Sequence, residues 1–274
     1  MTAQTRKIKL FKVPFASGTS RPGTEHGADS LIEAGLGRMI RNLGLEMTEE
    51  NFPVASDVEK VSSLLADRAA SSVVEGAFPL VLGGDRSVSA GAVAGVTRGA
   101  GNTGLIWFDA HPSLLTAETS TTGFANGMAL SSILSEGHVR KENVVLVGLR
   151  DVQPGEREWI RSEGLTCFTM HEIDRLGVEK VIEAALGVAG NGTDGIHVSL
   201  DADVLDPLEA PGVDWPVPGG LFFREAHFAF ELLSESGRIT SMDVTEVNPY
   251  LDEKRRTSKL IAGLIASLLG KKIL

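Results

Sequence analysis

Cysteine, tyrosine and long apolar runs are all scarce in this sequence. A single cysteine, Cys167, stands among 274 residues, which excludes an intramolecular disulfide and any cysteine-rich metal site. No apolar run approaches the roughly 20 residues that a membrane span needs. The N-terminal segment, residues 1–15, lacks the long apolar core of a signal peptide. We therefore expect a cytoplasmic protein that does not insert into membranes.

Positive charge is also in short supply. Lys and Arg number 26 against 36 Asp and Glu, a net charge of -10. Nucleic acid and anionic membrane surfaces would repel such a chain, so neither is an expected partner. Hydrophobic residues make up 42% and charged residues 23%, as in folded domains with a sizeable core. Because no Pro/Ser-rich linker divides it, we expect one domain over residues 1–274.

Seven apolar, β-branched runs predict buried strands. They are residues 8–15, 78–84, 103–110, 143–150, 165–170, 195–203 and 239–247. Segments with helical periodicity lie between them, for example residues 58–76 and the C-terminal stretch around 260–268. Strands apolar on both faces that alternate with helices are typical of a parallel sheet covered on both sides. The predicted fold class is therefore α/β.

Polar side chains follow four of these runs. They are Asp85 and Arg86; Asp109 and His111; Asp201, Asp203 and Asp206; and Glu246 and Asn248. Residues two apart on an extended chain point to the same side, so each Asp-x-Asp or Asp-x-His pair can act together. Clustered carboxylates repel one another unless a cation compensates, and one imidazole among them suits Mn²⁺ better than Ca²⁺ or Mg²⁺. The alternative is that these aspartates cap helices or turns, which we expect for Asp206.

The motifs, taken in order, resemble those of the ureohydrolases, the family of arginase, agmatinase and formimidoylglutamase. They are "GTEHGADSLIEAGL", "VLGGDRSVSAG", "WFDAHPSLLT", "VGLRDVQPGE", "SLDADVLDP", "APGVDWPVPGGLFFRE" and "MDVTEVNP". The resemblance covers nearly the whole chain. It implies a three-layer α-β-α fold with an eight-stranded parallel sheet, assembly as homo-trimers or hexamers, and hydrolysis of a guanidino-type carbon by hydroxide bridging two Mn²⁺ ions.

Two departures from the family pattern fall on one of the two metal sites. The resemblance assigns the other site to four residues that are all present: Asp109, His111, Asp201 and Asp203. The first site loses a histidine to Arg86 and an aspartate to Ser113. An arginine stays protonated and cannot be a metal ligand. We hypothesise that the Arg86 guanidinium takes the place of that ion, leaving one divalent metal or none per chain; the alternative is that Arg86 turns to solvent or a partner subunit.

Other departures concern the substrate. Asn126 stands where arginases carry a proton-shuttling histidine, and an amide cannot do that work. The positions that grip the amino-acid end of arginine also differ, with Leu115, Thr122, Phe124 and Gln153 in their place. Glu246, which in arginase holds the substrate guanidinium, is kept and could instead pair with the Arg86 guanidinium.

These residues leave activity open. One hypothesis is a divergent ureohydrolase that hydrolyses a C–N bond of a small guanidino, amidino or formimidoyl compound with one metal ion. Its catalytic positions would be Asp109, Glu246 and Asn126. The alternatives are a catalytically inactive homologue that acts as a binding or regulatory subunit, and a metal-free small-molecule binder.

Overall fold

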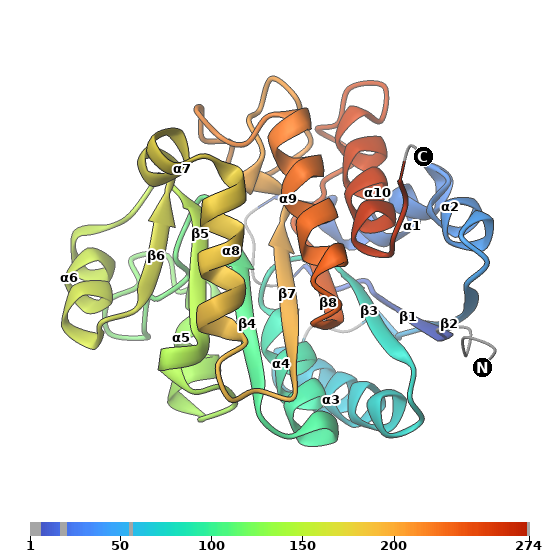
Figure 1. The fold of residues 1–274 in the computed structure, drawn as a ribbon, viewed down its shortest axis with the longest axis horizontal. Coiled ribbons are helices and arrows are strands. Elements are labelled where there is room, and N and C mark those ends of the chain that lie inside the picture. The colour runs from blue at the N-terminus through green and yellow to red at the C-terminus, as the bar shows by residue number, and fades with distance from the viewer. Residues whose placement is uncertain (1–6, 17–20, 55–56, 273–274) are drawn as a thin grey trace.

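The computed structural model describes residues 7–16, 21–54 and 57–272. The first six residues, part of the segment expected to lack a signal sequence, lie outside this part of the chain. Its centre is one sheet of eight strands in the order β2-β1-β3-β8-β7-β4-β5-β6 (Figure 1). Every pairing between neighbouring strands is parallel. The expected eight-stranded α/β fold is therefore confirmed.

The strands fall where the apolar runs predicted them, with one addition. They are β1 (Lys7–Val13), β2 (Glu46–Asn51), β3 (Phe78–Gly83), β4 (Thr103–Phe108), β5 (Val144–Leu149), β6 (Thr166–Thr169), β7 (Gly195–Asp201) and β8 (Ile239–Thr245). β2 has no apolar run, because it lies at the sheet edge and has no buried residue. The strands β3, β4, β5 and β7 are buried along their whole length, which explains their continuous hydrophobicity.

Helices cover both faces of the sheet. The α-helices are α1 (Gly27–Glu33), α2 (Leu36–Asn42), α3 (Val58–Val74), α4 (Val88–Ala100), α5 (Ala129–Ser135), α6 (Pro154–Glu163), α7 (Met170–Leu176), α8 (Val178–Ala189), α9 (Phe223–Glu235) and α10 (Arg256–Leu268). Short 3-10 turns are η1 (Thr24–His26), η2 (Ala125–Met128), η3 (Lys141–Asn143) and η4 (Ala202–Val204). In the part of the chain that the structure describes, no helix is long and apolar enough to cross a bilayer.

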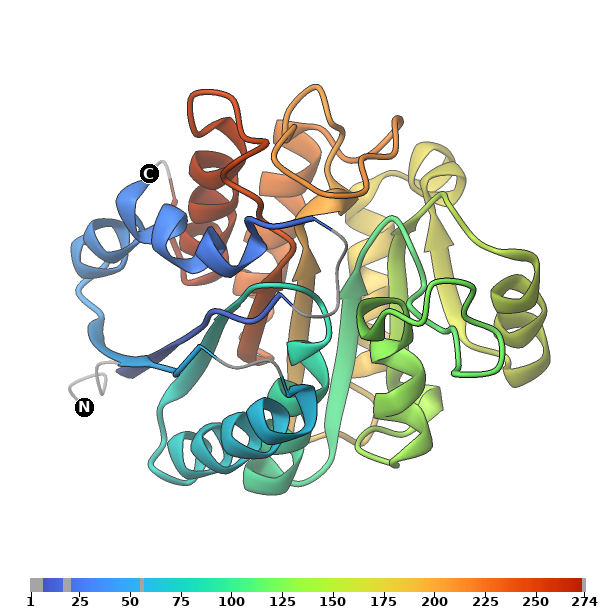
Figure 2. The same cartoon turned by 180° about the vertical axis from the view of Figure 1, so that it is seen from behind.

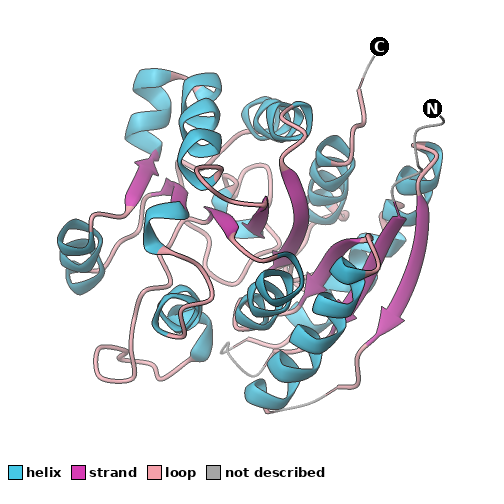
Figure 3. Cartoon of the chain, turned by 60° about the horizontal axis from the view of Figure 1, so that its bottom comes forward, coloured by secondary structure: helices cyan, strands magenta, loops and turns pink. Residues whose placement is uncertain are grey.

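The helices form two layers with the sheet between them. On the face turned to the viewer in Figure 1, α8, α9 and α10 pack side by side, with α7 beyond α8 and with α1 and α2 against α10. On the opposite face α3 packs along α4, and α4 contacts α5 (Figure 2). Figure 3 shows the strands running between these two sets. This is the three-layer arrangement expected from the motifs.

The sheet order decides where the polar strand ends meet. β3, β8, β7 and β4 are consecutive neighbours, and they are the four strands after which the sequence places its polar pairs. Because all four are parallel, their carboxyl ends lie at one edge of the sheet, where ligands bind in open α/β folds. Strands far apart in the chain therefore build one site.

Candidate active site

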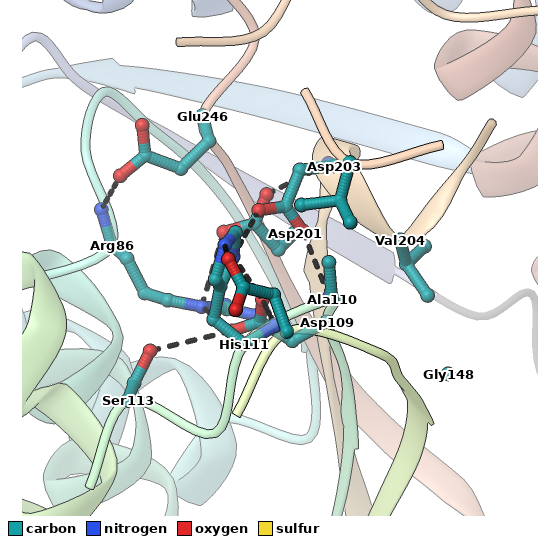
Figure 4. A network of polar contacts seen from close by, with 12 residues as sticks. Arg86, Asp109, Ala110, His111, Ser113, Gly148, Asp201, Asp203, Val204 and Glu246 are labelled. Atoms are coloured by element: carbon teal, nitrogen blue, oxygen red, sulfur yellow. Dashed lines mark hydrogen bonds and ion pairs between the residues drawn. The ribbon is translucent and has the colours of Figure 1, made fainter. Parts of the chain in front are cut away.

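The four central strand ends surround a cavity of about 240 Å³. Its floor carries the charged residues expected from the sequence, seen together in Figure 4: Arg86, Asp109, His111, Asp201, Asp203 and Glu246. Five of the six are buried, and His111 is half-buried. The expected site residues are thus brought together at one place.

Arg86 lies in the turn between β3 and α4 with only 2% of its surface exposed. Its Nε donates to Asp109 Oδ2 at 2.6 Å and lies 3.2 Å from Asp201 Oδ2. Burial alone would lower the pKa of the guanidinium, but the charges of these two carboxylates raise it above its ordinary value. Arg86 is therefore a permanent cation between two carboxylates, and it does not turn to solvent.

The other two nitrogens of the guanidinium are also hydrogen-bonded to the protein. Nη1 lies 3.3 Å from both Ser199 Oγ and Thr245 Oγ1, and Nη2 donates to the Phe108 carbonyl at 3.0 Å. Its central carbon stands 4.0 Å from the centre of the Trp107 ring, a cation–π contact. These contacts fix the orientation of Arg86 as well as its charge.

Asp109 accepts hydrogen bonds from three side chains on one oxygen. Besides Arg86, Trp107 Nε1 donates to Oδ2 at 3.1 Å and Ser113 Oγ at 3.3 Å. Burial would raise the pKa of this carboxyl, but the charge of Arg86 holds it well below its usual range. Ser113 takes part from a left-handed backbone conformation, with φ of 54°. The Asp109 oxygen on this side is thus already satisfied by protein groups.

The other side of the carboxylate cluster is built around His111. Its Nδ1 is 2.7 Å from Asp203 Oδ2, and its Nε2 is 3.5 Å from Asp151 at the cavity mouth. The Ala110 N–H donates to Asp203 Oδ1 at 2.9 Å, which orients that carboxylate. Burial would lower the pKa of His111, but Asp203 and Asp109 raise it to about 12. The His111 side chain remains 30% exposed, so this half opens to the cavity.

The donor set fits one divalent ion. Ligand atoms of Asp109, His111 and Asp203 lie within 4.8 Å of one another. Imidazole nitrogen with carboxylate oxygen is a ligand set that Mn²⁺ and similar ions accept. Asp201 stands outside that three-residue group: its Oδ1 accepts from the Asp203 N–H at 2.8 Å, and its Oδ2 faces Arg86. The Arg86 cation lies against Asp109 Oδ2 and Asp201 Oδ2, and a guanidinium cannot itself be a metal ligand.

Glu246 occupies the opposite wall in a strained conformation, with φ of 63°. Its Oε1 accepts from the Arg86 backbone N–H at 2.9 Å, and its Oε2 is buried without a hydrogen-bond partner. Burial, with the charge of Asp85, raises its pKa to about 8. The expected pairing of Glu246 with the Arg86 guanidinium was wrong, because that guanidinium points away to Asp109 and Asp201. The Glu246 Oε2 is thus engaged by neither the guanidinium nor the backbone of Arg86.

The loop residues singled out in the sequence line the same cavity. They are Leu115, Thr122, Phe124, Asn126 and Gln153. Asn126 lies on η2 and is half-buried. Asp206 accepts from the N–H groups of Leu208, Gly219 and Gly220, as expected for a structural aspartate.

Sequence reasoning missed the groups that hold Arg86 in place. Trp107, Ser199 and Thr245 sit inside apolar runs, where they were counted only as strand residues. Ser199 also donates to the buried Asp243 at 2.8 Å, so a third carboxylate supports the guanidinium from behind. The available signal was the presence of hydroxyl residues on the buried strands β7 and β8.

Comparison with known proteins agrees with this geometry. A family model described as the arginase family matches residues 6–270. The chain belongs to the arginase family. The arginase of Bacillus subtilis (strain 168) is 40% identical over 295 residues, covering 98% of this chain and 99% of that protein. A crystal structure of Bacillus subtilis arginase superposes with a TM-score of 0.94, over 98% of this chain and 100% of that one.

Two further arginase structures extend the likeness. Arginase from Bacillus caldovelox has a TM-score of 0.91 at 35% identity, covering 99% of this chain and 100% of that chain. Arginase from Entamoeba histolytica, in complex with L-ornithine, has a TM-score of 0.88 at 25% identity, covering 98% and 100%. The arginase-family fold is therefore kept over the whole length of these relatives, and the chain is a ureohydrolase-family protein.

Proposed function

We propose that this arginase-family protein hydrolyses a C–N bond of a small guanidino, amidino or formimidoyl compound with one divalent metal ion, best matched by Mn²⁺. The observation that carries the proposal is Glu246, which lines the same cavity as His111 and Asp203 and whose buried Oε2 has no hydrogen-bond partner among the described residues. A planar cation with N–H donors is the ligand that such an oxygen accepts best. The L-ornithine bound to the Entamoeba histolytica arginase supports a small nitrogen-rich ligand.

The single-ion part of the proposal rests on Arg86. Its guanidinium contacts Asp109 Oδ2 and Asp201 Oδ2, which leaves the group of Asp109, His111 and Asp203 as ligands for one ion. A divalent ion bound there would polarise the substrate and lower the pKa of water.

The protein residues contribute orientation and charge. Glu246, ionised when it meets a cation, would hold the guanidino or amidino group against the floor of the cavity. Arg86 neutralises two carboxylates without entering the reaction, because each of its three nitrogens is already hydrogen-bonded to a protein acceptor. Asn126 lines the wall but has no titratable proton, so it can orient a substrate and cannot shuttle a proton.

One observation favours the catalytically inactive alternative. Asp109 Oδ2 already accepts from Arg86, Trp107 and Ser113, so its half of the cluster is balanced without any metal. A chain of this kind would keep the pocket as a binding or regulatory subunit. The two proposals differ in whether bound metal is accompanied by turnover.

The test combines metal loading with product detection. The protein is incubated with Mn²⁺, Zn²⁺ or Ni²⁺, and release of urea or ammonia is followed for guanidino, amidino and formimidoyl compounds. Asp203→Asn, which removes one ligand charge, is the matched control and should abolish any turnover. Metal binding without turnover of any of these compounds would favour the inactive alternative.

Assembly and location stay predictions. We propose a homo-oligomer, a trimer or hexamer, in the cytoplasm, with residues 1–274 forming one domain and with neither nucleic acid nor membrane as a partner. Sedimentation equilibrium of the purified protein gives the subunit number directly.

A further inference from the structure

The outer part of the catalytic cavity is apolar, in contrast to its charged floor. Leu115, Phe124, Val213 and Trp215 line it together with a few polar residues. Trp215 is 46% exposed and stands at the open side, while Val213 is buried. A ligand whose head reaches Glu246 therefore has its tail against hydrocarbon and aromatic surface. Pockets of this composition bind apolar groups and use their few polar residues to set orientation.

Three of the polar groups beside this apolar surface are already engaged. Thr122 Oγ1 accepts from the Phe124 N–H at 3.3 Å within its own loop. Glu156 accepts from the Leu114 N–H at 3.0 Å and from the Gln153 backbone N–H at 3.1 Å. Asp214, which is buried, accepts from Asn248 Nδ2 at 2.6 Å. The neutral side chains that remain to contact a polar tail on this wall are the amides of Asn126 and Gln153.

The charges around the cavity exclude a carboxylate tail in particular. Among the described residues that line it, the groups that carry or can carry positive charge are Arg86 and His111. Both are held by carboxylates, Arg86 by Asp109 and His111 by Asp203. At the mouth stands Asp151, whose side chain is 62% exposed and would repel another carboxylate. A buried carboxylate without a counter-ion is strongly disfavoured.

We propose that the substrate of this site is a guanidine or amidine with an uncharged alkyl or aryl tail, and that the amino-acid group of arginine is excluded. The inference rests on the proposed function, since it assigns the tail of a ligand whose head is bound by Glu246. Leu115, Phe124 and Trp215 are then specificity-determining residues, and they act on binding rather than on the bond that is cleaved.

Calorimetric titration of the Mn²⁺-loaded protein with three ligands tests this. n-Butylguanidine, agmatine and L-arginine share the guanidinium head and differ in the tail, which is uncharged, cationic or zwitterionic. We expect n-butylguanidine to bind at least about tenfold more tightly than L-arginine, since one mismatched group in an apolar pocket is worth roughly 10-fold to 200-fold. Agmatine should bind with an affinity between these two, because the Asp151 carboxylate offsets part of the cost of placing a charged amine beside the apolar wall.

A pair of variants links the preference to the wall. Leu115→Asn places an amide in the cavity. It should bring the dissociation constants for n-butylguanidine and L-arginine closer together. Leu208→Asn is the matched control, because Leu208 is 71% exposed and does not line the cavity; it should leave the ratio unchanged. The readout is a ratio of dissociation constants, so a uniform loss of folded protein does not imitate the effect.

The outcomes separate this inference from the proposed function. L-Arginine or agmatine binding as tightly as n-butylguanidine would overturn the apolar-tail assignment while leaving a guanidine hydrolase in place. Failure of all three ligands to bind would remove both, because the Glu246 pocket would then not take a guanidinium. An unchanged ratio in Leu115→Asn would show that the wall does not select the tail.

Discussion

The two halves of the carboxylate cluster solve the same electrostatic problem in different ways. Around Arg86 the cluster is closed: the side chain is 2% exposed and each guanidinium nitrogen is hydrogen-bonded to a protein acceptor. Around His111 it is open, since that side chain is 30% exposed and borders the cavity. One half carries a cation that belongs to a side chain of the protein. The other half is open to a charged ligand that enters through the cavity.

This difference shows that one half of the carboxylate cluster can carry a permanent cation while the arginase-family fold is kept. Arg86 supplies a charge that neither pH nor metal supply alters, because its pKa is raised further by the neighbouring carboxylates. Asp201 shows the balance most clearly: burial and Asp203 raise its pKa, and Arg86 acts against them. The closed half would then stabilise the protein, while the open half would do any chemistry.

The largest expected effect comes from removing the closed half. Arg86→Ala leaves Asp109 and Asp201 buried without their cation, which should cost about 3 to 5 kcal/mol in the free energy of unfolding. Urea denaturation measures it. Arg98→Ala is the control, because Arg98 makes an exposed ion pair with Asp67 and its loss should be too small to resolve. Equal stability of both variants would mean that Arg86 is not the compensating charge.

A substitution in the open half should weaken metal binding and not the free energy of unfolding. His111→Ala deletes the imidazole of the candidate ligand group and should weaken Mn²⁺ binding by more than about 100-fold, beyond the loss typical of a supporting residue. Competition with a fluorescent chelator gives the affinity. His138→Ala, at a half-buried histidine that is paired with Glu136 and does not line the cavity, should leave it unchanged. Retained Mn²⁺ affinity in His111→Ala would place the ion elsewhere.

Glu246→Gln tests whether the charge of this carboxylate is what binds a guanidinium in the open part of the site. The carboxylate becomes a neutral amide of the same shape, so guanidinium affinity should fall by about 10-fold to 100-fold, the worth of a hydrogen bond to a charged group. Calorimetry with n-butylguanidine measures it. Asp151→Asn removes a charge at the exposed mouth and should change affinity far less. If the two variants lose affinity equally, the cavity attracts cations only through its overall charge.

The smallest expected effect is a pH dependence of the same binding. The folded pKa of Glu246 is about 8, above the ordinary 4.5, so its protonated form stabilises the fold; that contribution is complete below 4.5 and is lost as pH rises through 8. Guanidinium binding needs the ionised form. Affinity should therefore rise as pH increases toward 8, by no more in all than the loss expected for Glu246→Gln, and then level off. Glu246→Gln should give a profile without this rise.

The sequence predicted the strands better than the residues around Arg86. Buried parallel strands are apolar throughout, so their positions could be read directly, whereas the exposed edge strand β2 has no such signature. The placement of Arg86 followed from charge, because its carboxylate neighbours share one sheet edge. Its partners Ser199 and Thr245 could not be predicted, since a hydroxyl on a buried strand gives no sign of which side chain it will meet.

The direction of Glu246 escaped prediction for a different reason. Its left-handed backbone, held by a hydrogen bond from its N–H to the Gly84 carbonyl at 2.8 Å, turns the carboxylate toward the Arg86 backbone. Strain of this kind depends on tertiary contacts and leaves no local pattern in the residues. Sequence therefore indicated which groups meet, and the structure decided which atoms face each other.

The most direct test of the central claim is the number of metal ions per chain, measured by elemental analysis after incubation with excess Mn²⁺ and removal of free ion. The account predicts one ion for the natural chain and two for the double variant Arg86→His with Ser113→Asp, which restores both family ligands. Two ions per chain in the natural protein would contradict it, because Arg86 would then not occupy the place of the second metal.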